Sequence, residues 1–252
     1  MMMKRIISVI VLAALPLFAS AQKKGNECVL PVPGTETRSA EAGWKNNADW
    51  MAVAKDITAT LEGKSLDILL LGDSITQGFG GNRSLVASQK GKEAMDEAFG
   101  EDTWESAGIS GDRTQNLLWR IKTGEYEKCS PKYVVVTIGI NNVLAGNAPK
   151  DIAEGVIACA EEVKKIMPEA RVVMFGPLPA GLEADSQRRL ACNAIHECLA
   201  KRKIKGVEYI NPTAWFINAD GSMKTELYSR DHLHLSKEGY SVWSKEIAEI
   251  LK

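Results

Sequence analysis

The sequence predicts an α/β fold, in which a mostly parallel sheet is covered by helices on both faces. Short apolar runs alternate along the chain with longer segments whose apolar residues recur at helical spacing. Strands separated by helical segments are typical of β–α–β units and hence of parallel sheets. Because the crossovers in such units are right-handed, helices are expected on both faces. No internal repeat, low-complexity segment or linker interrupts the pattern, which indicates one domain.

The region before the first strand is predicted to hold an arm and one helix. Residues 22–40 are polar and carry Pro31, Pro33 and Gly34, as expected of an extended arm. A helix is predicted from Trp44 onward, and Gly63 ends it. The apolar residues that define its buried face are Trp50, Val53, Ile57 and Leu61.

The sheet is expected to contain five strands, of which the first is a nearly continuous apolar run and the third is strongly β-branched. In chain order they are Leu66–Leu71, Thr103–Ala107, Tyr133–Ile138, Arg171–Phe175 and Val207–Ile210.

Five helices are expected between and after these strands. Gly100 follows the first, and Pro149 and Pro168 flank the third, as is usual for helix ends. Each of the others carries apolar residues three and four positions apart. The predicted ranges are Ser84–Phe99, Thr114–Lys122, Asp151–Met167, Gln187–Lys201 and Lys237–Leu251.

The first 21 residues have the pattern of a signal peptide. Lys4 and Arg5 precede an apolar stretch that is short for a membrane span, and Ala19-Ser20-Ala21 is a small-residue cleavage site. We therefore expect cleavage before Gln22 and a secreted or periplasmic protein with no stable membrane anchor. The alternative is an uncleaved N-terminal anchor.

The net charge bears on nucleic-acid binding, and the cysteine count bears on disulfide bonding. Removal of Lys4 and Arg5 leaves 29 basic against 32 acidic residues, a formal charge of −3, so no nucleic-acid partner is expected. The five cysteines are an odd number for an exported protein, so at least one is free or paired between chains. Cys192 and Cys198 lie six apart in a predicted helix and cannot pair. We expect the core, rather than disulfides, to hold the fold.

Three glycine-containing turns follow the first three strands. The first is Gly72-Asp73-Ser74, the second includes Gly111, and the third includes Asn141. In a flavodoxin-like strand order, 2-1-3-4-5, the Ser74 turn lies between the other two, at the sheet edge where ligands bind. A serine flanked by a glycine turn and an amide side chain is a workable nucleophile with an oxyanion hole.

A serine hydroxyl needs a base to take its proton, and the chain has three histidines. His196 lies inside a predicted helix, where an exposed or core role is expected. His234 precedes the last helix, and Asp231 stands three residues before it, well placed to orient its ring. His232 is the alternative base. Metal ligation by Asp231, His232 and His234 is disfavoured because no second His or Cys cluster accompanies them.

These residues resemble the signature blocks of the SGNH, or GDSL, hydrolase superfamily. Gly72-Asp73-Ser74 matches the first block, Gly111 the second, Asn141 the third, and Asp231-x-x-His234 the fifth. The resemblance runs from about Leu66 to the C-terminus. It implies a flavodoxin-like three-layer α/β/α sandwich, a catalytic set of Ser74, Asp231 and His234, and an oxyanion hole formed by Ser74, Gly111 and Asn141.

Residues 111–120 and the sequence Gly139-Ile140-Asn141-Asn142 are similar to the branch that contains platelet-activating-factor acetylhydrolase catalytic subunits. Many relatives carry aspartate in place of Asn142. Exported members of this branch often resemble carbohydrate or sialate O-acetylesterases. The resemblance therefore implies a serine esterase for short O-acyl groups, acetyl first, on a small-molecule or glycan ester, with no cofactor and no metal.

Other interpretations remain beside this one. A lysophospholipase or thioesterase of the same superfamily would need a longer apolar pocket, and a non-catalytic carbohydrate-binding protein would not need the complete residue set. The irregular segment Pro177–Gln187 either borders the site or is a plain surface loop. We expect a signal peptide at residues 1–21, the arm and helix at 22–65, and the hydrolase domain at 66–252.

Overall fold

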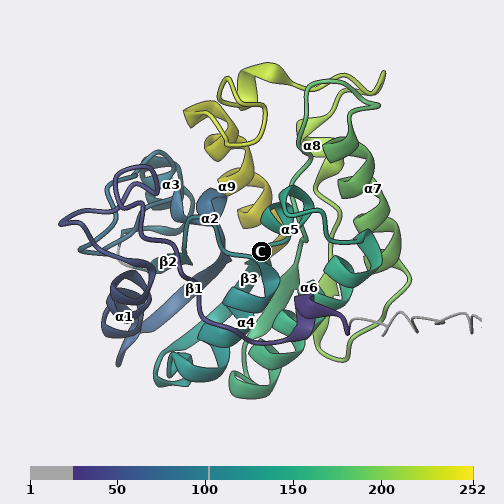
Figure 1. Ribbon diagram of the computed structural model, residues 1–252. Coiled ribbons are helices and arrows are strands. Elements are labelled where there is room, and N and C mark those ends of the chain that lie inside the picture. The colour runs from purple at the N-terminus through teal and green to yellow at the C-terminus, as the bar shows by residue number, and fades with distance from the viewer. Residues whose placement is uncertain (1–24, 102, 252) are drawn as a thin grey trace, which may run out of the picture.

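The computed structural model describes residues 25–101 and 103–251. The predicted signal peptide at residues 1–21 lies outside these ranges. The described chain forms a five-stranded, all-parallel sheet between two layers of helices (Figure 1). The strand order, β2-β1-β3-β4-β5, is the flavodoxin-like order that the sequence predicts. Within the described ranges, none of the helices has the length and apolar character that a membrane span requires.

The five strands form where apolar and β-branched runs were predicted. All five predictions are confirmed, with shifts of a few residues at the ends. The strands are β1 (Ser65–Gly72), β2 (Trp104–Gly108), β3 (Ser130–Thr137), β4 (Arg171–Met174) and β5 (Val207–Tyr209).

Two apolar cores lie on opposite faces of the sheet because successive strand residues point to opposite sides. Leu69 and Leu71 of β1 belong to one core, and Ile68 and Leu70 belong to the other. The first core contains α1 (Trp50–Leu61), α4 (Thr114–Thr123) and α6 (Pro149–Ile166). The second contains α3 (Lys92–Phe99), α8 (Thr213–Phe216) and α9 (Lys237–Leu251), while α7 (Gln187–Ala200) contributes to both.

Two predicted helices are shorter than expected. The helix predicted from Trp44 begins at Trp50, because Asn46 and Asn47 have positive φ and the Asp49 carboxylate caps the N–H of Ala52. The helix predicted over Ser84–Phe99 is confined to Lys92–Phe99. The residues before it form a loop in which Val86 is buried and pairs with Trp44 in an isolated antiparallel bridge.

The structure adds three short helices that the sequence did not predict. Two of them, α2 (Ser74–Gln77) and α5 (Ile140–Leu144), follow β1 and β3 directly, and the third is α8. Short 3₁₀ segments also occur, at η1 (Glu27–Val29), η2 (Tyr126–Lys128) and η3 (Thr225–Leu227). All five cysteines are free thiols, and only Cys198 is partly exposed.

Candidate active site

The carboxyl ends of three neighbouring strands are level with one another. Gly72 of β1 pairs with Gly108 of β2 on one side and with Thr137 of β3 on the other. The turns that carry Ser74, Gly111 and Asn141 therefore leave the same edge of the sheet. This is where parallel α/β sheets bind their ligands.

The Ser74 turn is fixed by close packing. Ser74 begins the single-turn helix α2, and the Asp73 carboxylate accepts a hydrogen bond of 3.0 Å from the N–H of Ile75. A side chain at Gly108 would place its Cβ 2.2 Å from the backbone nitrogen of Gln77, so the β2 end can approach α2 only as glycine. Ser74 itself is half-buried and remains open to solvent.

The structure places Ser74, His234 and Asp231 in one hydrogen-bonded line. Ser74 Oγ lies 2.9 Å from His234 Nε2, and His234 Nδ1 lies 2.6 Å from Asp231 Oδ2. The other Asp231 oxygen accepts the backbone N–H groups of Leu233 and His234. Burial opposes charge on Asp231, but these bonds from His234 and Leu233 prevail and lower the pKa of its carboxyl. An ionised Asp231 fixes the ring with its Nδ1 proton, leaving Nε2 free to accept from serine.

The two other histidines lie elsewhere. His232 has a φ of +51°, and its carbonyl oxygen accepts the N–H of Gly181 at 2.9 Å. His196 is buried, with its ring nitrogens 2.9 Å from the Tyr209 hydroxyl and the Pro177 carbonyl oxygen. Burial lowers the pKa of His196 to about 4, so this ring stays neutral as part of the core.

The segment Pro177–Gln187 contacts the loop that carries His234. The N–H of Gly181 donates to His232, and the Tyr228 hydroxyl donates to the Pro179 carbonyl at 2.7 Å. Arg189 of α7 donates to the Gly181 carbonyl at 2.6 Å. The segment therefore supports the histidine loop and is more than a plain surface connection.

Donor groups of the predicted oxyanion hole come from all three turns. Within the described residues, the backbone N–H groups of Ser74 and Gly111 donate to no protein acceptor. Gly111 is exposed and has a φ of +85°, a left-handed conformation that favours glycine. The Asn141 amide donates one N–H to the Asp112 carbonyl at 2.9 Å, which orients the carboxamide and leaves its second N–H available.

A buried ion pair lies beneath the predicted oxyanion turn, residues 108–112, which contains Gly111. Arg120 of α4 is 2.7 Å from Asp112, and each side chain is 1% exposed. Arg120 also donates to the carbonyl oxygens of Ala107 and Gly72, at the ends of β2 and β1. Burial raises the pKa of the Asp112 carboxyl, and the Arg120 guanidinium opposes that rise. The pair thus ties the oxyanion turn to both strands.

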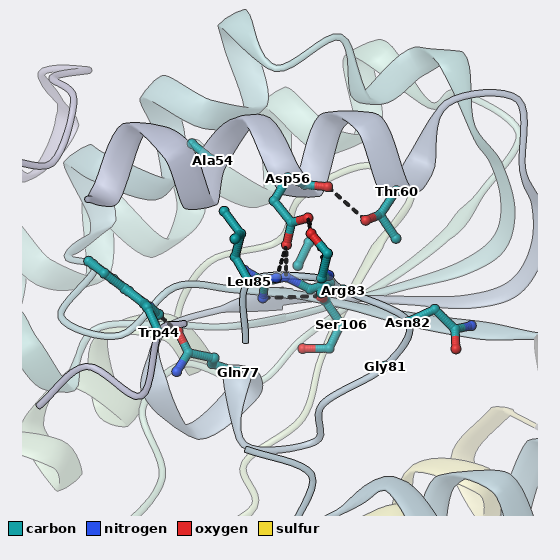
Figure 2. Close-up of polar contacts among 12 residues, drawn as sticks. Trp44, Ala54, Asp56, Thr60, Gln77, Gly81, Asn82, Arg83, Leu85 and Ser106 are labelled. Carbon is teal, nitrogen blue, oxygen red and sulfur yellow. Dashed lines mark hydrogen bonds and ion pairs between the residues drawn. The ribbon is translucent and has the colours of Figure 1, made fainter. Parts of the chain in front are cut away.

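A second buried arginine supports the β2 end from the other side. Figure 2 shows Arg83 between Asp56 of α1 and Ser106 of β2. Its Nη1 donates to the Ser106 and Gly108 carbonyl oxygens, and its Nε lies 3.9 Å from the Asp56 carboxylate. Its Nε and Nη2 make no hydrogen bond, although both are buried. Burial lowers the pKa of Arg83 to about 10, so the side chain is a cation at neutral pH.

Sequence reasoning missed Arg83, Arg120 and Gln77 as parts of the site. Gln77 accepts hydrogen bonds of 2.9 Å from the Ser110 N–H and from the Trp44 indole, and so connects α2 to the oxyanion turn (Figure 2). Arg120 carried a detectable signal, because it lies between Leu117 and Ile121 on the buried side of a predicted helix. Nothing in the sequence around Arg83 or Gln77 indicates burial.

Metal ligation by Asp231, His232 and His234 was the disfavoured alternative in the sequence. Among residues 25–101 and 103–251, no three His, Cys, Asp or Glu side chains are grouped closely enough to hold an ion. Hydrogen bonds instead join Ser74 to His234 and His234 to Asp231.

Comparison with known proteins places the chain in a family. The model of the GDSL-like lipase/acylhydrolase family matches residues 70–242, which include all five predicted site residues. The chain belongs to this family. It is 30% identical to platelet-activating factor acetylhydrolase IB subunit alpha1 of Rattus norvegicus over 206 residues, covering 80% of this chain and 82% of that protein. It is 28% identical to the alpha2 subunit of Gallus gallus over 204 residues, covering 80% and 83%.

Solved structures of similar fold include esterases and lipases. A catalytic mutant of Axe2, an acetylxylan esterase from Geobacillus stearothermophilus, has a TM-score of 0.59 at 14% identity, covering 75% of this chain and 94% of that one. The lipase Lip_vut3 from a goat rumen metagenome has a TM-score of 0.54 at 19% identity, covering 73% and 96%. These likenesses confirm the predicted three-layer α/β/α fold with a parallel sheet between helices.

Proposed function

We propose that this protein is a serine esterase that hydrolyses short O-acyl esters, acetyl first, through an acyl-serine intermediate. The observation that carries the proposal is the hydrogen-bonded line from Ser74 through His234 to Asp231. A hydroxyl, an imidazole and a carboxylate in this order are the parts of nucleophilic acyl transfer. A protein that only binds carbohydrate does not need a serine, a histidine and an aspartate that are hydrogen-bonded in this order.

The first half of the proposed reaction forms the acyl enzyme. His234 Nε2 takes the proton of Ser74 as Oγ attacks the ester carbonyl carbon. The resulting oxyanion accepts hydrogen bonds from the N–H groups of Ser74 and Gly111 and from the Asn141 amide. The tetrahedral intermediate then breaks its bond to the alcohol oxygen, which receives the proton from His234. Asp231 stabilises the imidazolium throughout and keeps its own charge.

The second half releases the acid. His234 removes a proton from water, and the hydroxide attacks the carbonyl carbon of the acyl-serine. The same three donors hold the second oxyanion. Collapse of this intermediate returns the His234 proton to Ser74 Oγ and frees the carboxylic acid. No step in this scheme calls for a cofactor.

A short acyl group is supported by the names of the relatives. The matched curated proteins are acetylhydrolases, and one similar structure is an acetylxylan esterase. The name of the acetylhydrolases refers to a lipid, and that of the esterase refers to a glycan. The two names therefore agree on the acetyl group and differ in the alcohol that carries it. The acetylhydrolase relatives favour, as a second candidate, an esterase for a lipid substrate.

A chain-length series tests the acyl preference. The p-nitrophenyl esters from acetate to decanoate are compared by kcat/KM, with Ser74→Ala as the background control. An optimum at the two-carbon ester supports the proposal. An optimum at eight or ten carbons would replace it with the lysophospholipase or thioesterase alternative.

We also propose that the protein is exported. The support is the charged start, apolar stretch and small-residue cleavage site of residues 1–21. N-terminal sequencing of the protein recovered from outside the cytoplasm should begin at Gln22. Recovery of an intact N-terminus from the cytoplasm would contradict this proposal.

A further inference from the structure

The N-terminal arm forms a wall beside the oxyanion turn. Its purple trace crosses the ends of α4 and α6 in Figure 1, and η1 contacts both helices. The N–H of Val32 donates to the Gln115 carbonyl, and Asn116 donates to the Val32 carbonyl, each at 3.2 Å. Further along, the Glu36 carbonyl accepts the N–H of Trp50 at 3.0 Å. The arm is therefore bonded to α4 and α1 at both ends of residues 32–36.

The middle of this wall rests on an aromatic side chain. A Cβ at Gly34 would come within 2.4 Å of the Trp50 indole, so the arm lies in direct contact with the ring. Trp50 Nε1 in turn donates to Asp112 at 2.6 Å. The wall, the ring and the oxyanion turn are thus one packed unit.

Two cavities separate the wall from the oxyanion turn. The larger cavity has a volume of about 590 Å³, and the smaller one has a volume of about 240 Å³. Both are lined by Glu36, Ser110 and Gly111. The larger also contacts Arg113, and the smaller also contacts Arg38. A substrate held at Gly111 would extend into this space.

The charged groups around the two cavities offer both donors and acceptors. Hydrogen bonds from Arg38 lower the pKa of Glu36 to about 2, so this carboxylate is ionised. Arg113 is half-buried, and within the described residues its guanidinium has no hydrogen bond or ion pair. Apolar acyl chains gain nothing from such a lining, since they would desolvate the charges. Sugar hydroxyl groups, which both donate and accept, fit it well.

We infer that the arm, Arg113 and the oxyanion turn form a subsite for the sugar ring of an O-acetylated carbohydrate. Arg113 donates to hydroxyl or ring oxygens, and Glu36 accepts from a hydroxyl at the opposite wall. The inference rests on the proposed esterase function, and it decides between the glycan and lipid alcohols that the relatives leave open. A polyhydroxylated ring is the expected ligand, and a phospholipid is not.

The test compares two substrates in one variant. Arg113→Gln is assayed with p-nitrophenyl acetate, which has no hydroxyl group, and with an acetylated xylo-oligosaccharide. Losing a hydrogen bond from a charged donor costs about 1.5–3 kcal/mol, so kcat/KM for the sugar ester should fall about 10- to 100-fold, mainly through KM. The loss with p-nitrophenyl acetate should be several-fold smaller. Arg188→Gln, at an exposed position of α7, is the matched control and should leave kcat/KM unchanged for both esters.

The outcomes separate the subsite from the esterase function. If the wild type hydrolyses neither ester, the proposed function fails. If it hydrolyses both and Arg113→Gln lowers them equally, the subsite is wrong and the function stands. Preference for an acetylated phospholipid over the sugar ester, with the loss in Arg113→Gln confined to the lipid, would also overturn the inference.

Discussion

Ser74 Oγ and His234 Nε2 lie 2.9 Å apart although 160 positions separate them in the sequence. The serine follows β1, and the histidine precedes α9. A further hydrogen bond, from the Tyr240 hydroxyl to the Ile75 carbonyl at 2.7 Å, joins α9 to α2 just behind this contact. The packing of the last helix against the nucleophile turn therefore sets the distance on which the proposed chemistry depends.

Two separate alanine variants test which of the neighbouring histidines is the base. His234→Ala removes the proposed acceptor of the Ser74 proton, so kcat for p-nitrophenyl acetate should fall by at least about 10²-fold. His232→Ala should retain most of the activity, because its ring makes no hydrogen bond to Ser74 in the described residues. Steady-state kinetics of both variants decide the matter. The reverse order of activities would assign the base to His232.

The oxyanion donors are tested at Asn141. Replacement by alanine removes the proposed amide donor to the developing charge, and such losses typically lower kcat about 10²–10³-fold. KM should change little, because the charge appears only in the transition state. An unchanged kcat in a folded Asn141→Ala protein would remove this residue from the oxyanion hole.

The buried pair of Arg120 and Asp112 is tested by stability. Arg120→Met leaves the Asp112 charge without its partner, and breaking a buried pair typically costs about 3–5 kcal/mol. Urea unfolding should show this loss of stability as a lower urea concentration at the unfolding midpoint. Arg171→Met breaks an exposed pair with Glu208 and serves as the control, with a cost of about 1 kcal/mol or less. Similar losses in the two variants would contradict the role assigned to the buried pair.

Asp73 should make stability depend on pH. Burial, helped by the negative charge of Asp112, raises the pKa of its carboxyl to about 7. The native state therefore holds a proton that the unfolded chain releases near pH 4, and wild-type stability falls through this group as pH rises from 4 to 7. Asp73→Asn cannot ionise, so its stability relative to wild type should rise over the same interval and level off above pH 7.

Measurement of unfolding free energies at pH 5, 6, 7 and 8 checks this sign. Asn retains an oxygen that can accept the Ile75 N–H, so the helix cap persists in the variant. A stability difference that stays constant across the four pH values would show that Asp73 does not titrate in this range.

Strands β1, β3 and β4 were predictable because each contains a compact apolar run, whereas contacts with distant residues set the helix boundaries. The 84–91 segment was predicted to be helical, yet Val86 within it and Arg83 just before it are buried by contacts with distant residues. The early start at Trp44 failed for a similar reason, since Trp44 bonds to Gln77 in α2 rather than to its own helix. Such partners are not visible in a local pattern.

The residues of the candidate site likewise fall into those that could be predicted from the sequence and those that could not. Ser74, Gly111, Asn141, Asp231 and His234 stand in recognisable blocks, so their identities could be predicted, and the strand order placed three of their turns together. The supporting residues could not be predicted in their roles. Arg83 and Arg120 act by donating to backbone carbonyls at the ends of β1 and β2, and backbone acceptors leave no trace in the sequence.

Covalent labelling is the sharpest test of whether Ser74 is the nucleophile. A fluorophosphonate reacts with an activated serine, and mass spectrometry of the digested protein locates the adduct. One adduct per chain is expected, on Ser74, and none in Ser74→Ala. A folded wild-type protein that stays unlabelled, or that carries its adduct on another residue while Ser74 is unmodified, would contradict it.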